Sequence, residues 1–256
     1  MRSKLLLIIT FYFLFSNLSL AQKKTFVPVK GEIVFSSTAI IPDTSYFLAS
    51  LKENNRRLVD YLVKKLDIAN DEKVDTASLL TLMSGSISPK SFSENFDYHF
   101  LYQDSLIESY KTLNSKRSNS FSIINTKQLN YTDLMVFDDD TSGTDPVNFQ
   151  YLKLKDKNIK EFKSEKRVIN GYECFKVVVK YKIDFGEEDD SLEKIIGNEQ
   201  CIAVYWVTDK IQSLFHPVSK EKEILENYYP LEITYDNPLH KGLSLVYRLR
   251  STSLSD

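Results

Sequence analysis

Apolar and polar residues alternate along most of the chain from residue 96 onward, which predicts a series of β-strands. In Phe96–Gln103, the clearest example, an aromatic residue occupies every second position. A period of two places alternate side chains on opposite faces of a strand. The same kind of pattern predicts further strands at 106–113, 121–124, 129–137, 149–154, 163–169, 172–183, 202–208, 231–235 and 243–249.

Before residue 96 the pattern is mainly helical. A short alternating run predicts a strand at 30–37, and Pro42-Asp43-Thr44 then gives a helix start signal. Apolar residues follow at helical spacing, at Phe47, Leu51, Leu58, Leu62 and Leu66. We expect this amphipathic helix to lie over the sheet and shield its apolar side, and a second, short helix to form at 74–83.

Asn170-Gly171 lies between two strand-like runs, which is the strongest short-range signal for a β-hairpin. About ten strands with short turns, preceded by helices, predict an α+β fold. We expect a mostly antiparallel β-sheet with the N-terminal helices packed on it. We expect residues 22–256 to form a single domain.

Residues 1–21 have the layout of a secretory signal peptide: a basic start, an apolar run over 5–15, and small residues before the cleavage point at Ala21. A membrane-spanning helix would need about 20 apolar residues, which is more than this run contains. We therefore expect an exported protein of the periplasm or cell envelope. After cleavage we expect no integral membrane segment.

Charge and composition argue against some partners. The chain has 33 basic and 35 acidic residues, a formal net charge of −2, and no long run of Lys or Arg. Nucleic-acid binding needs a concentrated basic surface, so we expect no nucleic-acid partner. With only seven glycines, the chain has no Gly-rich phosphate-binding loop.

The sequence shows no arrangement of residues typical of catalysis. His99 lies among the aromatic residues of an expected strand, so we interpret it as a structural or surface residue. His216 and His240 lie at loop edges, so we interpret both as surface residues. No His or Cys spacing is that of a zinc site. We expect no catalytic residues, no metal and no cofactor. An enzyme would need His99 to meet an acid such as Asp97 or Glu94 in a cleft.

The acidic run Asp138–Asp145 imitates the start of a calcium-binding loop, because oxygen ligands at 138, 140 and 142 precede Gly143. Phe149 stands where the closing Glu of such a loop would be. We favour a solvated turn between two strands, with calcium binding as the alternative.

Cys174 and Cys201 are the two cysteines, and in an exported protein an even pair suggests a disulfide. If their strands form one hairpin, Cys174 lies opposite position 208 and Cys201 opposite position 181. The two would then be about seven residues out of register, on the order of 20 Å apart. We favour two separate buried thiols, with a disulfide as the alternative.

The segment 165–208 and the residues just after it contain a characteristic set of positions: Ile169, Asn170, Gly171, Tyr172, Cys174, Lys176, Ala203, Trp206, Thr208 and Ile211. In these residues the segment resembles the hairpin core of the GLPGLI family, exported proteins of Bacteroidetes-type bacteria with no established activity. The family's name-giving stretch is absent, and residues 229–233 occupy its place. The family is distantly similar to the LolA-like fold, which implies a curved β-sheet, open like half a barrel, whose concave face can hold lipid.

Together these observations predict an exported, non-enzymatic envelope protein that binds a lipid or another apolar ligand on a concave sheet face. The expected ligand-binding residues are Phe175, Val177, Val179, Tyr181 and Trp206. The alternative is a structural or protein-interaction module of the cell envelope, with an envelope protein as its partner and no small-molecule ligand.

Overall fold

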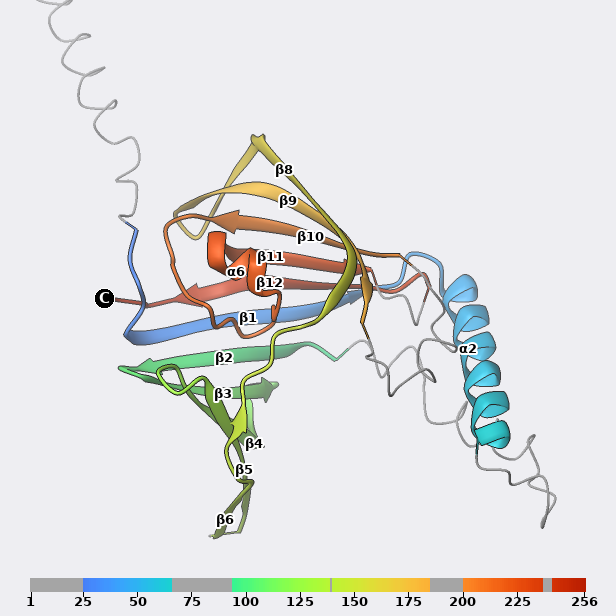
Figure 1. The fold of residues 1–256 in the computed structure, drawn as a ribbon, viewed down its shortest axis with the longest axis horizontal. Helices are drawn as coiled ribbons and strands as arrows, with labels where there is room; N and C mark the ends of the chain where they lie inside the picture. Colours follow the sequence, from blue (N-terminus) through green and yellow to red (C-terminus); the bar gives the residue numbers. More distant parts are fainter. Residues whose placement is uncertain (1–24, 66–93, 139, 185–199, 237–240) are drawn as a thin grey trace, which may run out of the picture.

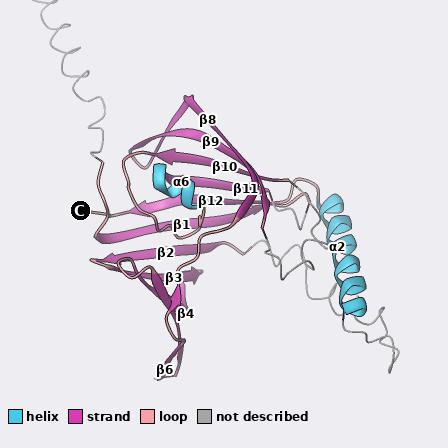
Figure 2. Cartoon of the chain, in the orientation of Figure 1, coloured by secondary structure: helices cyan, strands magenta, loops and turns pink. Residues whose placement is uncertain are grey.

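The protein forms an open, antiparallel β-sheet (Figures 1 and 2). The structure is a computed structural model that describes residues 25–65, 94–138, 140–184, 200–236 and 241–256. The expected signal peptide at 1–21, the expected helix at 74–83 and His240 lie outside these residues.

Twelve strands and two helices are present in the described residues. The strands are β1 (Lys30–Ile40), β2 (Phe96–Gln103), β3 (Leu106–Leu113), β4 (Lys116–Asn125), β5 (Asn130–Phe137), β6 (Asp140–Gly143), β7 (Val147–Asn148), β8 (Leu154–Ile169), β9 (Tyr172–Ile183), β10 (Cys201–Thr208), β11 (Tyr229–Asp236) and β12 (Ser244–Thr252). The helices are α2 (Thr44–Lys65) and α6 (Lys222–Asn227).

The sheet order is β6-β5-β4-β3-β2-β1-β12-β11-β10-β9-β8, with β7 paired to β5. Most neighbours are successive hairpin strands, and β1 joins the two halves by pairing with both β2 and β12. All strand pairs are antiparallel, and the end strands β6 and β8 do not meet, so the sheet is not closed. The prediction of a mostly antiparallel, open sheet is confirmed.

The β8–β9 hairpin turns at Asn170-Gly171, as the sequence predicts. Both residues have positive φ, 48° at Asn170 and 81° at Gly171. A two-residue turn with two positive φ angles matches the right-handed twist of the strands that it joins. Asn and Gly tolerate this region of φ better than other residues, which explains why this pair occupies the turn.

Helix α2 begins where the sequence predicts, because the Asp43 carboxylate accepts a hydrogen bond from the Tyr46 backbone N–H at 3.0 Å and caps the helix. Its buried residues Phe47 and Leu51 pack against Leu243. This contact lies at the ends of the strands, and Figure 1 shows α2 beside the sheet there. The expectation that this helix lies over the sheet is therefore wrong. The predicted α+β class is confirmed only in part, because the described residues contain few helices.

The connection from β10 to β11, residues 209–228, takes the place of the expected helical lid, and we call it the cover segment. In Figure 1 its helix α6 lies in front of β10–β12. It packs on what we call the inner face of the sheet, the face that carries Val177, Tyr205 and Ile233. Ile224 of the cover segment is buried against these residues. The inner face of β9–β12 is therefore a filled core.

One predicted strand is absent. Residues 149–154 are irregular except for Leu154, which begins β8. The Phe149 ring packs edge to face against Tyr131, Tyr151 and Phe215, with ring centroids 5.0–6.5 Å apart. The apolar residues of this run contact the sheet and the cover segment through their side chains, and, apart from Leu154, they do not pair with a neighbouring strand.

Candidate functional site

Four of the five predicted ligand-binding residues share the inner face. Phe175, Val177, Val179 and Tyr181 alternate along β9 and pair with Val207, Tyr205, Ala203 and Cys201 of β10. Val177, Val179 and Tyr181 are buried in the core beneath Ile224, and Phe175 stacks edge to face on Tyr228 at 5.0 Å. The cover segment therefore occupies the position that an apolar ligand would take.

Trp206, the fifth predicted residue, lies on the opposite face of β10, because it follows the inward-facing Tyr205. The Arg167 guanidinium lies 4.0 Å from the centre of its ring, within cation–π distance. Arg167 also forms an ion pair with Glu232 at 2.8 Å, and Glu232 pairs with Trp206 across the strands. The structure does not bring Trp206 together with the other four residues.

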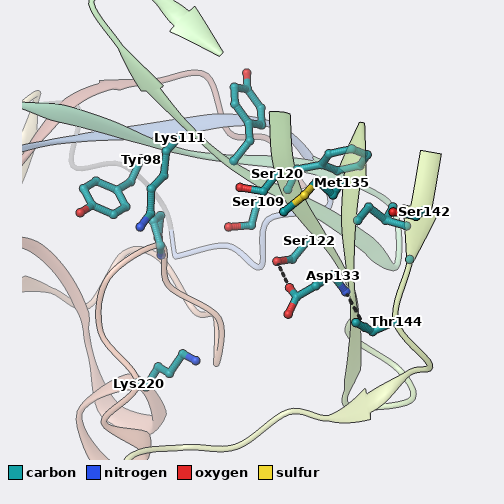
Figure 3. A pocket seen from close by; sticks show the side chains of 15 residues that line it. Tyr98, Ser109, Lys111, Ser120, Ser122, Asp133, Met135, Ser142, Thr144 and Lys220 are labelled. Atoms are coloured by element: carbon teal, nitrogen blue, oxygen red, sulfur yellow. Dashed lines mark hydrogen bonds between the residues drawn. The ribbon is translucent and has the colours of Figure 1, made fainter. Parts of the chain in front are cut away.

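The unfilled part of the inner face lies over β3, β4 and β5. The register carries this face across the sheet through the pairs Phe100–Ser109, Ser109–Ser122 and Ser122–Asp133. A groove of about 770 Å³ opens here, with Pro217 and Lys220 of the cover segment on one side. In Figure 3, Ser122 and Asp133 lie between Lys220, at the lower left, and Thr144, at the right.

Oxygen atoms form a row across the floor of this groove. The Ser122 hydroxyl donates to Asp133 Oδ1 at 2.5 Å, and the Asp133 backbone N–H donates to Thr144 Oγ1 at 3.3 Å. Within the described chain, no group donates to Asp133 Oδ2 or bonds to the Ser109 hydroxyl. These positions can bind a ligand that offers hydroxyl groups.

Two lysines at the groove have no anionic partner among the described residues. Lys111 Nζ lies 5.0 Å from the centre of the Tyr98 ring, and Lys220 Nζ lies 5.7 Å from the centre of the Phe149 ring. Neither ammonium group forms an ion pair in the part of the chain that is described. Asp133 is the single acidic residue in the lining, so the groove carries more positive than negative charge.

A second, smaller cleft of about 450 Å³ lies at the turn ends of β2–β5. Its lining is more apolar and includes Val27, Leu129, Leu214, Phe215 and Leu225. The side chains of Val27 and Leu129 are about half exposed. This cleft is the most apolar of the hollows described here.

A buried polar network fixes the cover segment to the sheet. The Tyr205 hydroxyl donates to the Glu221 carboxylate, whose other oxygen, Oε2, has no hydrogen-bond partner in the described residues. Burial raises the pKa of Glu221 to about 7, while the Tyr205 hydrogen bond and the Lys157 charge oppose this rise. Because burying a charged carboxylate is costly, the neutral acid is favoured below about pH 7.

His216 is buried, so its interpretation as a surface residue is wrong. Its Nδ1 accepts the backbone N–H groups of Val218 and Ser219 at 3.0 and 2.9 Å. The Nε2 atom therefore carries the proton and donates it to the Pro230 carbonyl at 3.0 Å. Burial lowers the pKa of His216 to about 3, so the ring is neutral. His216 joins the cover segment to β11.

His99 does meet an acid, but the acid is Glu32 rather than Asp97 or Glu94. Glu32 Oε1 lies 2.9 Å from His99 Nδ1, and Thr112 Oγ1 lies 3.2 Å from His99 Nε2. A hydroxyl, an imidazole and a carboxylate in this order can form a catalytic triad. However, none of the three residues lines the groove or the cleft, and the Tyr110 ring stacks on His99 at 4.5 Å. The three side chains are hydrogen-bonded to one another, and we interpret them as a structural network.

Asp140 and Ser142 belong to strand β6, and Asp138 at φ 52° begins the turn from β5. Asp139 lies outside the described residues. In the described ranges no three His, Cys, Asp or Glu side chains are grouped as for a metal ion.

Comparison with known protein families and with curated proteins finds no match for this chain. None of the helices that the structure describes combines the length and the apolar character that crossing a membrane requires.

Proposed function

We propose that the protein is an exported, non-enzymatic binding protein of the cell envelope, and that its ligand lies in the groove over β3–β5. The single observation that supports this proposal is that the cover segment fills the inner face of β9–β12, whereas the part of this face around Ser109, Ser122 and Asp133 stays open within the described residues. A ligand-binding protein leaves one concave region unfilled and lines it with a few polar groups. The likeness of 165–208 to the GLPGLI family supports the expectation of export.

The ligand of this groove is polar or amphiphilic. Serines and Asp133 form its floor, and an acyl chain there would cover polar atoms without offering them hydrogen bonds. The five residues first expected to hold an apolar ligand do not line the groove.

A direct test is native mass spectrometry of the protein purified from its own envelope, followed by thermal-shift screening of polar and lipid compounds. We expect a bound compound or a stabilising hit. Substitution of Ser122 by Leu should then abolish the effect, because the larger side chain fills the groove floor, whereas the same change at exposed Ser164, on β8 and outside the groove, should not. Hits that are indifferent to Ser122→Leu would contradict this location.

The smaller cleft supports a second candidate, the binding of an acyl chain. Its apolar lining, which includes exposed Leu129, matches such a ligand better than the groove does. Leu129→Asp should abolish lipid binding in this case and leave a groove ligand unaffected. If neither hollow binds any compound and cross-linking in cells recovers an envelope protein, the interaction module is favoured.

A further inference from the structure

We infer that the ligand of the groove is an acidic oligosaccharide, a chain of hydroxyl-bearing rings that also carries carboxylate or sulfate groups. This inference rests on the proposed function, because it names the ligand class of the same site. Three features of the groove support it: the row of oxygens, the carboxylate oxygen of Asp133 that accepts no hydrogen bond from the described chain, and the two lysines without an ion-pair partner in the described residues.

The row of oxygens suits an extended polyol. Ser109, Ser122 and Asp133 are directly paired across three neighbouring strands, and Thr144 follows beside Asp133. Neighbouring strands lie about 4.8 Å apart, so the row offers a polar group at each such step. A sugar chain presents hydroxyl groups along its whole length and can bond to several of these positions together. An acyl chain has none to offer.

Asp133 distinguishes a polyol from most other polar ligands. Its Oδ1 is occupied by the Ser122 hydroxyl, and its Oδ2 accepts no hydrogen bond from the described chain. An ionised carboxylate is an acceptor only, and its hydrogen bonds are stronger than those between neutral groups. A ligand that covers this oxygen must therefore donate a hydrogen bond to it, as a sugar hydroxyl can.

The two lysines of the groove are the reason why we infer acidic groups on the ligand. Lys111 and Lys220 line the groove, and in the view of Figure 3 both lie on the Tyr98 side of the serines, with Ser142 and Thr144 on the other side. Each contacts an aromatic ring and neither has an ion-pair partner within the described residues. The whole chain has a net charge of −2, so this local excess of positive charge is a departure from the average surface.

The test compares tetragalacturonic acid with its methyl ester, which keeps most of the hydroxyls and lacks the charge, in isothermal titration at low salt. A C16 fatty acid serves as a third ligand. We expect the acid to bind, and the ester to bind at least about tenfold more weakly, because two ammonium groups lose their partners. Binding of the acid should weaken as salt is added.

Variants assign the contacts. Asp133→Asn should weaken binding about tenfold, since hydrogen bonds to a charged group are the stronger ones. Lys111→Gln and Lys220→Gln should each weaken binding of the acid by up to about fivefold and leave binding of the ester unchanged. The matched control is Lys160→Gln, on the edge strand β8 and outside the groove, which should change nothing.

The outcomes separate the two proposals. Binding of the fatty acid alone, sensitive to Ser122→Leu, would overturn the acidic oligosaccharide and keep the groove as a binding site. Equal binding of acid and ester would overturn the role of the lysines. If neither sugar nor fatty acid binds, and the protein from its native envelope carries no adduct, both the inference and the proposed function fail.

Discussion

Tyr205, on the inner face of β10, donates a hydrogen bond to the carboxylate of Glu221 in the cover segment. Glu221 is only 3% exposed, and it lies among the hydroxyl groups of Tyr205 and its hydrogen-bonded neighbour Tyr235. The sheet and the segment that covers it are therefore joined by a buried ionisable group. Their attachment should depend on pH.

The first prediction concerns this pH dependence. Burial raises the pKa of Glu221 from an ordinary 4.5 to about 7 in the folded protein, so the folded state holds the proton more tightly than the unfolded chain. Protonated Glu221 therefore contributes to the free energy of unfolding. This contribution is fully present below about pH 4.5 and is lost as the pH rises to about 7. Relative to Glu221→Gln, the wild type should lose about 3 kcal/mol of unfolding free energy between these pH values.

Urea unfolding at a series of pH values measures this difference. Glu226→Gln is the matched control, because it removes an exposed carboxylate of α6, the helix that Glu221 precedes as its N-cap residue. An equal pH-dependent difference for Glu226→Gln would show that burial of Glu221 is not the cause.

The second prediction concerns His216, which bonds to three backbone groups. His216→Ala leaves two N–H groups and one carbonyl without their partner, at about 1–3 kcal/mol for each group that stays buried. We expect the free energy of unfolding at pH 7 to fall by about 2–4 kcal/mol. His216→Gln, which can replace part of this bonding, should lose less. Equal unfolding free energies for the wild type and His216→Ala would contradict the structural role.

The same histidine should make the protein acid-sensitive. Burial lowers the pKa of His216 from 6.5 to about 3, so the unfolded chain takes up this proton more readily. The stability that neutral His216 provides is present above about pH 6.5 and is lost as the pH falls towards 3. In His216→Ala this part of the acid sensitivity should be absent, which the same series of urea titrations measures.

Local patterns predict much of the sheet correctly. The Asn170-Gly171 turn fixes the register of β8 on β9, and the expected hairpin of β9 and β10 places Cys201 opposite Tyr181 as predicted. Strands β3 and β9 have the predicted bounds, 106–113 and 172–183. These features depend on neighbouring residues and on a period of two, both of which are present in the sequence.

The cover segment could not be predicted in this way. Residues 209–228 have no helical or strand period, and their structure comes from long-range contacts, such as Ile224 on the inner face and His216 at Pro230. The sequence shows apolar stripes but not which of them the chain itself covers. It therefore predicts Val177 and Val179 as ligand contacts, although both are core residues.

The groove was missed because its polar floor gives no signal of binding. Ser120 and Ser122 alternate with Phe121 and Ile123, so the period predicts the strand but not which face is the inner one. That assignment comes from the register across β1, which pairs strands more than 200 residues apart in the chain. A sequence signal does exist: serines at every second position indicate that one face of this strand is not core.

The third prediction concerns the thiols. Cys174 and Cys201 are both buried and are not joined by a disulfide. Burial raises the pKa of Cys174 to about 12, which keeps it protonated and unreactive. Native protein should react slowly with Ellman's reagent. Protein unfolded in guanidinium chloride should show two reactive thiols per chain without any reductant. If the denatured protein shows no reactive thiol until a reductant is added, the two cysteines form a disulfide.

The fourth prediction is that the cover segment is part of the core rather than a lid. Ile224 packs on Val177, Val179 and Ala203, so Ile224→Ala removes buried methyl groups and leaves a cavity. We expect a loss of about 2–5 kcal/mol of unfolding free energy. Leu152→Ala, at a residue that is 42% exposed, is the control and should cost less than about 1 kcal/mol. If Ile224→Ala is as mild as this control, the segment detaches freely.

The fifth prediction separates the groove from the core. Ser109 and Ser122 lie on the inner face where no other part of the described chain covers the sheet, so the fold does not require their hydroxyl groups. Valine suits a strand better than serine, and the unfolding free energies of Ser109→Val and Ser122→Val should stay within about 0.5 kcal/mol of wild type. Val177→Ser, in the filled core of β9–β12, should instead lower the unfolding free energy by several kcal/mol, because it places a hydroxyl in the core. A loss of that size for either serine variant would mean that the groove is closed in solution, and the proposed ligand would then have no place to bind.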